Sequence, residues 1–343
     1  MSKNVTMKDI AEKLGVSIVA VSKALSGQKG VSAELRSRIK RTADQMGYVS
    51  GTKTAKKGSA SNNVGIIVAE RYISDNSFYF AFLKEITSAL QSHGNYAFFH
   101  TLTLKNEEEL ILPDIFFTQR VDGIIILGQV SDRYIKAVME TRIPPVFLDF
   151  YNEMTADRCV ISDSFYGIYE MTNYLIKNGH RKIAFVGNIH TTSSIQDRYL
   201  GYEKSLMEHG IPLHDYFIIS DRNSETGDMI PIELPLIMPT AFVCNCDESA
   251  CRLISILKEN GYRVPDDISV TGFDNSVYSS ISVPNITTVA VNVERMAAIA
   301  VDELIKAMDK PGYSFGMLQV KGSIIYKDSV SSLNYGKQLS IDN

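Results

Sequence analysis

The fold of the N-terminal region is decided by the stretch VTMKDIAEKLGVSIVAVSKALSG, residues 5–27. Thr6 precedes a run with apolar residues at helical spacing, and its hydroxyl can cap that helix. Gly15 follows the run and can adopt the left-handed backbone conformation that ends a helix. Ser17 can then cap a second helix, from Ile18 to Leu25. Two short helices joined by a tight glycine turn are typical of a helix-turn-helix.

A third helix is predicted at residues 33–46, capped by Ser32. In a helix-turn-helix, the second helix enters the major groove of DNA with its N-terminus first. We therefore expect five residues of that helix to face DNA: Ile18, Val19, Ala20, Ser22 and Lys23. Lys23 can donate to a guanine edge or a phosphate, whereas Ile18 and Val19 offer only apolar contact, for instance to a thymine methyl. The alternative is a three-helix packing module whose exposed apolar residues meet protein.

Charge is distributed unevenly along the chain. Residues 1–60 hold twelve Lys and Arg against four Asp and Glu, a formal charge of +8, whereas residues 61–343 hold 23 against 35, a charge of −12. A basic head on an acidic body indicates that the head meets a polyanion and the body does not. A basic solubilising tail is the alternative explanation.

Residues 50–63, SGTKTAKKGSASNN, contain no large apolar side chain and cannot build a core. They predict a linker between a head at 1–49 and a larger core at 64–330, with a tail at 331–343. Lys53 and Lys57 keep the linker attractive to phosphate. Together with Thr6, Ser17 and Ser32, whose hydroxyls lie at helix N-termini, they complete the predicted DNA-binding set.

The overall composition excludes several classes of protein. The 343 residues suit two domains or more, and 45% hydrophobic with 22% charged residues is ordinary for a soluble protein. No apolar run approaches the roughly 18 residues that span a bilayer, and the first residues carry charges where a signal peptide has an apolar segment. Four cysteines are too few for a disulfide scaffold. We expect a cytoplasmic protein with no membrane partner.

From residue 64 onward, short apolar runs alternate with helical patterns, which predicts parallel sheets covered on both faces. Ten strands are too many for one sheet, so two lobes are expected, with a break near residue 162. The predicted strands are Val64–Ala69, Tyr96–Thr101, Val121–Leu127, Pro145–Asp149, Cys159–Ile161, Lys182–Val186, Phe217–Ile219, Ala241–Cys244, Ser269–Phe273 and Thr287–Val291.

The ends of these strands are polar, and ligands of open α/β sheets bind beyond the carboxyl ends of strands. Gln129, Asp149, Asp247 and Asp274 close or follow strands, Phe78 and Tyr79 follow the first strand, and Asp197 and Arg198 follow the sixth. Carboxylates and an arginine among aromatic faces suit a ligand with many hydroxyls. Taken singly, each carboxylate is better explained as a cap of the next helix, but the coincidence of several polar strand ends favours a site.

Four segments resemble signatures of one family, the LacI-type bacterial transcription regulators. They are the N-terminal VTMKDIAEKLGVS…VSKALSG, then NGHRKIAFVG at 178–187, DRYLGY at 197–202 and GYRVPDDISVTGFDN at 261–275. The resemblance implies a small all-α helix-turn-helix head and an α/β two-lobed core like that of periplasmic binding proteins. It further implies a homodimer on a pseudo-palindromic operator, and a small effector, usually a sugar or nucleoside-like compound, that changes operator affinity.

The resemblance also assigns residues. Phe78, Tyr79, Asp149, Arg198, Asp274 and Gln129 match positions where family members contact the effector. Crossovers near residues 161, 291 and 322 would make lobe 1 about 64–161 and 292–321, and lobe 2 about 162–291 and 322–330.

This chain departs from the family pattern at three places. Ser50 and Gly51 stand where the family has Pro-Asn, and Lys57 stands near the place of a leucine that wedges into the minor groove. Cys246-Asp247 replaces an expected Asn-Asp, and Arg222 stands where several relatives have an aromatic. Arg222, Cys246 and Asp247 complete the predicted effector-binding set, but the departures argue against copying any one relative's effector.

Two other classes compete with a regulator. A secreted solute-binding protein would share the core, and an enzyme could use a doubly wound sheet. The chain has neither GxGxxG after a strand nor GxxxxGK[ST], and Cys244, Cys246 and Cys251 are better explained as structural thiols. We therefore expect no enzyme, cofactor or metal, and an operator-binding, effector-controlled repressor. The alternative is a small-molecule (sugar) binding protein without a regulatory DNA role.

Overall fold

The computed structural model describes residues 7–25, 31–46, 62–73, 77–114, 121–141 and 143–333. Contacts divide the chain into two units, Met1–Ala60 and Ser61–Asn343, which are called the head and the core. Each unit is described by itself. In the described part of the chain, no helix combines the length and the apolar character needed to cross a bilayer.

The head consists of α1 (Met7–Leu14), α2 (Ile18–Leu25) and α3 (Ala33–Gln45). Its core is formed by one apolar face of each helix, with Ile10, Val21 and Ile39 fully buried. Gly15 ends α1 with φ +65°, the left-handed conformation that glycine adopts without strain. The short turn between α1 and α2 therefore follows from the sequence as expected.

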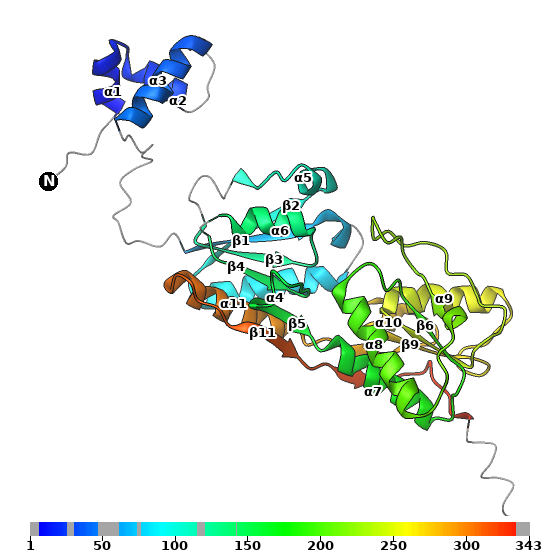
Figure 1. Ribbon diagram of the computed structural model, residues 1–343. Helices are drawn as coiled ribbons and strands as arrows, with labels where there is room; N and C mark the ends of the chain where they lie inside the picture. Colours follow the sequence, from blue (N-terminus) through cyan, green and yellow to red (C-terminus); the bar gives the residue numbers. More distant parts are fainter. Residues whose placement is uncertain are drawn as a thin grey trace, which may run out of the picture. The chain divides into compact units, whose positions relative to one another are not determined.

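The first sheet of the core has six parallel strands in the order β11-β5-β4-β3-β1-β2 (Figure 1). The strands are β1 (Asn63–Ala69), β2 (Tyr96–Leu102), β3 (Gly123–Leu127), β4 (Pro145–Leu148), β5 (Arg158–Ser162) and β11 (Gly316–Val320). One face is covered by α4 (Ser77–Ser92) and α11 (Val293–Asp309), and the other by α6 (Asp132–Met139). A 3-10 turn, η1 (Glu70–Tyr72), follows β1, and α5 (Leu104–Glu108) follows β2. This layered unit is lobe 1.

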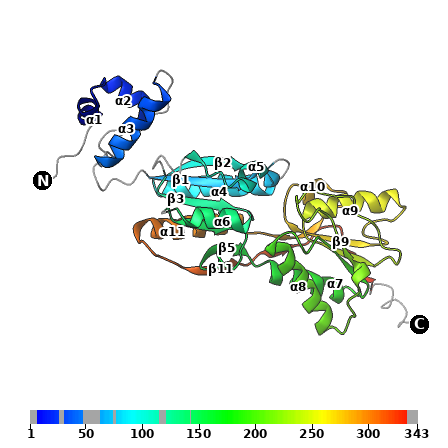
Figure 2. The ribbon, with the colours of Figure 1, turned by 45° about the horizontal axis from the view of Figure 1, so that its top comes forward.

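The second sheet has the order β12-β10-β9-β8-β6-β7, parallel except for the pair β10 and β12. The strands are β6 (Ile183–Val186), β7 (Ile218–Ile219), β8 (Ala241–Cys244), β9 (Ser269–Asp274), β10 (Thr287–Ala290) and β12 (Ser323–Ile325). Figure 2 shows α7 (Ser164–Lys177) and α8 (Ser193–Glu208) on one face and α9 (Asp247–Glu259) and α10 (Tyr278–Ile281) on the other. This unit is lobe 2.

The interior strands of both sheets are buried on both faces, because successive side chains of a strand point to opposite sides and helices cover each side. Ile66 packs under α4 and α11, whereas its neighbour Ile67 packs under α6, and both are buried. Gly201 permits the close approach of α8 to α7, since a Cβ there would overlap the carbonyl oxygen of Phe165. This explains the glycine of the DRYLGY segment by packing.

The chain passes between the lobes three times, after β5, after β10 and after β11. The predicted fold class, an all-α head with a two-lobed α/β core of parallel sheets, is confirmed. Two predictions of detail are corrected: Phe217 belongs to a 3-10 turn, η3 (Asp215–Phe217), rather than to a strand, and β11 and β12 are strands that the sequence patterns did not reveal. Both are short and half-exposed, so they lack the continuous apolar run of an interior strand.

Candidate functional site

The second helix of the head, α2, presents one face to solvent. Ile18 is 49% exposed, and Ala20 and Lys23 are partly exposed, whereas Val21 and Ala24 are fully buried. An exposed isoleucine at the N-terminus of a short helix is available to a partner. The side chains of Val19 and Ser22, and the residues Thr6, Lys53 and Lys57, lie outside the described residues.

The two serines predicted to contact phosphate act as helix caps. Ser17 Oγ accepts from the backbone N–H of Ala20 at 3.1 Å, and Ser32 Oγ accepts from that of Leu35 at 3.3 Å. The structure adds an anchor that the sequence did not reveal: Arg36 Nη1 donates to the carbonyl oxygens of Lys23 and Ala24, both at 3.2 Å. Arg36 therefore fixes the end of α2 against α3.

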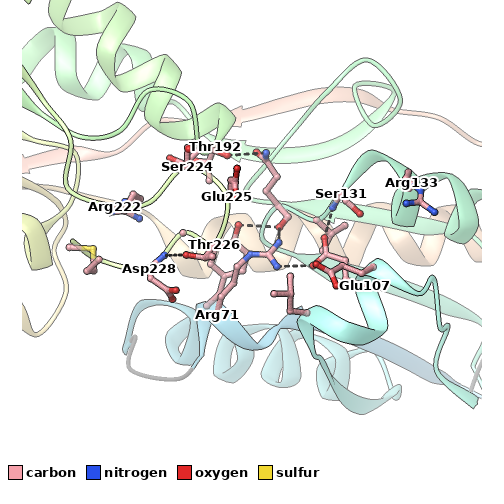
Figure 3. A pocket seen from close by; sticks show the side chains of 18 of the residues that line it. Arg71, Glu107, Ser131, Arg133, Thr192, Arg222, Ser224, Glu225, Thr226 and Asp228 are labelled. Atoms are coloured by element: carbon pink, nitrogen blue, oxygen red, sulfur yellow. Dashed lines mark hydrogen bonds and ion pairs between the residues drawn. The ribbon is translucent and has the colours of Figure 1, made fainter.

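In the core, a cavity of about 600 Å³ opens between the lobes (Figure 3). Lobe 1 contributes Arg71, Tyr72, Gln129 and residues of α5 and α6, and lobe 2 contributes Thr191, Thr192, Arg222, the 224–229 loop and the start of α9. The volume is in the usual range for small-molecule sites. Of the predicted effector residues, Gln129 and Arg222 line this cavity.

Gln129 joins the two lobes directly. Its Nε2 donates to the carbonyl oxygen of Thr191 at 3.3 Å, and its Oε1 accepts from the backbone N–H of Ser193, the first residue of α8, at 3.0 Å. A second contact runs between Tyr151 of lobe 1 and Asp197 of lobe 2, with the hydroxyl 2.9 Å from Oδ1. These contacts form an interlobe clasp beside the cavity.

Arg71, which the sequence analysis missed, holds the backbone of Gln129. Its Nη2 donates to the Gln129 carbonyl oxygen at 2.7 Å, and its Nη1 pairs with Glu107 Oε2 at 2.7 Å. Glu107 is only 5% exposed and also accepts from the backbone N–H of Ser131 at 2.6 Å. The rule of polar residues after strands could have found Arg71, because it lies two residues beyond β1.

Asp149 and Asp274 lie at the carboxyl ends of β4 and β9; Asp149 is 7% exposed, and the side chain of Asp274 is 11% exposed. Both adopt positive φ, +71° and +101°, which is rare for residues with a side chain and typical of functional sites. Tyr79 donates to Asp149 Oδ2 at 3.0 Å. Arg198 Nη1 donates to the Asn245 carbonyl oxygen at 2.6 Å, and its Nη2 lies 3.5 Å from Asp274 Oδ1.

Burial dominates the electrostatics of these carboxyl groups. It raises the pKa of Asp149 to about 6, although Arg198 and the hydrogen bond from Tyr79 lower it. It raises the pKa of Asp274 to about 8, with Arg198 lowering it and the neighbouring Asp247 raising it further. A group at each lobe is therefore ready to exchange a proton near neutral pH.

Arg222 is held rigidly by Asp221. Its Nε and Nη2 donate to the two carboxylate oxygens of Asp221 at 3.1 and 2.8 Å, and Asp221 is fully buried. Nη2 also lies 3.2 Å from Asn245 Oδ1 and 3.5 Å from Cys246 Sγ. Two of the departures from the family pattern, Arg222 and Cys246, are thus in contact.

The remaining predicted effector residues have structural partners. Asp247 is fully buried: its Oδ2 accepts from the backbone N–H of Ser276 at 2.7 Å, and its Oδ1 lies over Gly272. Burial raises the pKa of Asp247 to about 7. Phe78 is 7% exposed and packs edge-on against Tyr79 and Phe82 in the core of lobe 1.

Comparisons with known proteins agree with this architecture. The family described as "Bacterial regulatory proteins, lacI family" matches residues 6–50, and the "Periplasmic binding protein-like domain" matches residues 172–330. The protein named "Probable HTH-type transcriptional repressor ExuR" of Bacillus subtilis (strain 168) is 27% identical over 336 residues, 96% of this chain and 99% of that protein.

Two solved structures share the fold. A "transcriptional regulator CelR-cellobiose complex" superimposes with a TM-score of 0.68 at 20% identity, covering 95% of this chain and 100% of that one. The lac repressor dimer bound to operator and the anti-inducer ONPF superimposes with a TM-score of 0.67 at 22% identity, covering 96% and 100%. At these identities the two structures support the fold alone.

Head and core together therefore define a bacterial transcription regulator with a periplasmic-binding-protein-like core. The chain combines a helix-turn-helix domain of the LacI family with a periplasmic-binding-protein-like domain. The relatives are named as transcriptional repressors, a probable one in the case of ExuR, which agrees with the expectation that this chain is no enzyme.

Proposed function

We propose that this protein is a cytoplasmic, dimeric repressor that binds a specific operator and is controlled by a sugar or related polyhydroxy compound bound between the lobes. The observation that carries the proposal is the combination, in one chain, of an exposed α2 in the head and a polar cavity between the lobes of the core. A sugar-binding protein without a DNA role would have no use for such a head.

The head supplies the DNA contacts. Lys23 and Ile18 are on the exposed face of α2. Lys23 can donate to a guanine edge or to a phosphate, and Ile18 can contact a thymine methyl. Ser17 and Ser32 stand at the N-termini of α2 and α3, where backbone N–H groups favour phosphate. Arg36 keeps α2 in place while it binds.

The core supplies the control. Carboxylates and guanidinium groups bind hydroxyls through charge-assisted hydrogen bonds, and both lobes contribute such groups. A ligand that bridges the lobes binds one arrangement of the lobes more tightly than another. It therefore shifts the equilibrium between those arrangements. The Gln129 clasp is the contact that such a ligand would replace or reinforce, since its partners Thr191 and Ser193 belong to the other lobe.

Exposed apolar surface supports a homodimer. β2 is an edge strand, and Tyr96, Phe98 and Phe99 on it are 67%, 43% and 51% exposed. In lobe 2, Ile281 and Val283 are 61% and 85% exposed. Apolar side chains gathered on a strand edge and beside a short helix mark an interface, and a second copy of this chain is the proposed occupant.

The experiment selects operator sites from random DNA with the full-length protein and measures affinity by fluorescence anisotropy, with and without a panel of sugars. We expect one dominant half-site and its inverted repeat, and a change in affinity of about tenfold or more with at least one sugar. Absence of sequence preference would overturn the repressor function and favour the binding protein without a DNA role.

A matched pair of lysine variants distinguishes recognition of the operator by α2 from a nonspecific effect of positive charge. Lys23→Ala is expected to lower operator affinity by about tenfold. Lys258→Ala removes the same charge from an exposed position of α9, and it should leave operator affinity unchanged. Equal effects of the two variants would mean that α2 does not read the operator.

A further inference from the structure

Lobe 1 holds the backbone of Gln129, the residue whose side chain makes the interlobe clasp. The Gln129 carbonyl oxygen accepts from Arg71 Nη2 at 2.7 Å and from the Tyr72 hydroxyl at 3.0 Å, so both of its lone pairs are used. Gly128 precedes it with φ +80°, and a Cβ there would lie 2.7 Å from the Tyr72 ring. The peptide that carries the Gln129 side chain is therefore fixed by its own lobe.

Arg71 is in turn oriented by Glu107 of α5 (Figure 3). Arg71 Nη1 donates to Glu107 Oε2 at 2.7 Å, and the other oxygen of this buried carboxylate accepts from the Ser131 backbone N–H at 2.6 Å. Because a guanidinium presents several donors in a rigid plane, Arg71 can pair with Glu107 and hold the Gln129 carbonyl oxygen together. Among the described residues, neither Arg71 nor Glu107 makes a hydrogen bond or ion pair with lobe 2. An effect of this pair on lobe 2 through hydrogen bonds therefore passes through Gln129.

The partner of Gln129 in lobe 2 is the first N–H group of α8. Residues in the first turn of a helix have no intrahelical acceptor for their N–H groups. The Thr192 hydroxyl caps the Ile195 N–H at 3.3 Å. The acceptor of the Ser193 N–H is instead Gln129 Oε1, at 3.0 Å, and Ser193 Oγ accepts from the Tyr151 N–H of lobe 1 at 3.3 Å. The start of α8 is thus satisfied by groups of lobe 1.

The clasp bears on the buried groups of lobe 2 because α8 also carries Arg198, whose Nη1 donates to the Asn245 carbonyl oxygen at 2.6 Å. A contact that exists in one arrangement of the lobes and not in another favours the first arrangement by its free energy. Ordering a glutamine side chain costs conformational entropy, and a backbone that is fixed in advance lowers this cost. The pair of Arg71 and Glu107 therefore strengthens the contact that Gln129 makes between the lobes.

We propose that Arg71 and Glu107 are positioning residues for the response to effector. The pair fixes Gln129, and Gln129 then holds the two lobes in one arrangement through the Ser193 N–H. Because both lobes line the cavity, the effector binds this clasped arrangement, and a stronger clasp raises its apparent affinity. The role in effector binding rests on the proposed function, whereas the clasp itself can be measured without any ligand.

The first measurement is hydrogen exchange of the Ser193 amide in the full-length protein with no sugar added, by mass spectrometry with fragmentation that resolves single amides. The double variant Arg71→Met/Glu107→Gln removes the ion pair and leaves no charge buried without a partner. It should make this amide exchange about fivefold faster, the factor that corresponds to the loss of one ordinary hydrogen bond. The Asn245 amide, which donates to the Val186 carbonyl oxygen within lobe 2, should exchange at an unchanged rate.

The second measurement asks whether the pair acts through Gln129. Gln129→Ala alone should speed exchange of the Ser193 amide by about fivefold or more. Adding Arg71→Met/Glu107→Gln to Gln129→Ala should give no further change, since mutations that act through one contact are not additive. The matched control is Arg158→Ala, which removes a paired arginine of lobe 1 at the start of β5, the opposite end of the sheet from the cavity. It should leave exchange of the Ser193 amide unchanged.

The third measurement uses a sugar that changes operator affinity in the selection experiment. Arg71→Met/Glu107→Gln should raise the sugar concentration that gives half of this change by about fivefold, because a smaller fraction of the protein has the clasped arrangement. In the Gln129→Ala background the same double variant should cause no further shift. Arg71 and Glu107 both line the cavity, so a shift that persists in that background would mean direct contact with the sugar and would contradict positioning.

Three further outcomes would overturn the inference. Unchanged exchange of the Ser193 amide in Arg71→Met/Glu107→Gln would show that the pair does not support the clasp, and would leave the proposed function standing. Additive effects of this double variant and Gln129→Ala on exchange would place the action of the pair in another contact, such as the approach of Arg71 Cδ to Gly227. A lower half-maximal sugar concentration in the double variant would show that the effector favours the unclasped arrangement.

Two outcomes separate the clasp from the proposed function. Absence of sequence preference for DNA, together with faster exchange of the Ser193 amide in Arg71→Met/Glu107→Gln, would overturn the repressor function and support the clasp. Absence of any sugar effect, with operator binding intact, would overturn the role of Arg71 and Glu107 in the response to effector.

Discussion

The head and the core of this protein use polar groups in opposite ways. In the head, residues that are available to a partner, such as Ile18 and Lys23, lie on the surface of α2, and the side chains buried between the described helices are mainly apolar. In the core, Asp149, Arg198 and Asp274 are largely buried and face one another across the ends of strands. A surface that binds a polyanion works by screened charge, whereas a buried site works by prearranged hydrogen bonds.

The largest difference between the head and the core is expected in the salt dependence of binding. Raising monovalent salt from 50 to 200 mM should lower operator affinity by about 10³-fold, because several phosphates release counterions when the basic heads of a dimer bind. Effector affinity should change less than twofold over the same range, since buried groups are poorly screened. Anisotropy and calorimetry on the same preparation measure the two. An equal salt dependence of operator affinity and effector affinity would contradict the proposed difference between an exposed, charged head and a buried site in the core.

Arg198 tests whether the buried cluster is also structural. Arg198→Ala removes the donor to the Asn245 carbonyl oxygen and the guanidinium that lies 3.9 Å from the Phe273 ring centroid. It should lower the free energy of unfolding by roughly 3 kcal/mol and abolish the response to effector. Urea denaturation measures the first effect. The control Arg263→Ala, at an exposed arginine, should leave the unfolding midpoint nearly unchanged; loss of effector response without loss of stability would assign Arg198 to binding alone.

The pH dependence should belong to the core. The pKa of Asp274 is about 8 in the folded protein, above its usual value of 3.8, because the carboxyl group is buried. The folded state therefore binds a proton more tightly than the unfolded state, and the free energy of unfolding should fall as pH rises from about 4 to about 8. Asp149 and Asp247, also raised, act in the same direction.

The variant Asp274→Asn measures how much of this pH dependence of stability comes from Asp274. The variant should flatten the decline of stability with pH by more than the ~1.4 kcal/mol that one pKa unit represents. Denaturation curves between pH 5 and 9 give the slope. If the variant and the wild type share one slope, Asp274 is not the titrating group.

The smallest effect is expected from a cap in the head. Ser17→Ala removes the hydroxyl that accepts from the Ala20 N–H, and it should destabilise the head by about 1 kcal/mol. Ser17→Asp should restore stability, since aspartate caps equally well, but it should weaken operator binding by repelling phosphate. Circular dichroism and anisotropy separate the two readouts. Full operator affinity of Ser17→Asp would contradict a phosphate close to this cap.

The head could be predicted almost completely from the sequence. Its caps, its glycine turn and the apolar spacing of Ile10, Val21 and Ile39 are local signals, and the helices begin where Thr6, Ser17 and Ser32 indicated. In the core, the alternation of apolar runs and helical patterns predicted parallel sheets, and the rule of polar strand ends pointed to Gln129, Asp149 and Asp274. Arg36 and Glu107 could not be found in this way because their partners are 13 and 36 residues away.

What the sequence by itself determined is the set of elements and the residue types at strand ends, because helix caps and apolar periods act between neighbours in the chain. Only the tertiary structure decided which of those polar groups line the cavity. Gln129 and Arg222 do so, whereas Asp247 is fully buried against Ser276 and Gly272. The physical reason is that burial and pairing depend on contacts between segments that are far apart in the chain. Such contacts bring Arg71 to Glu107 within lobe 1, clasp Gln129 to Ser193 between the lobes and bury Asp274, whose pKa rises as a result.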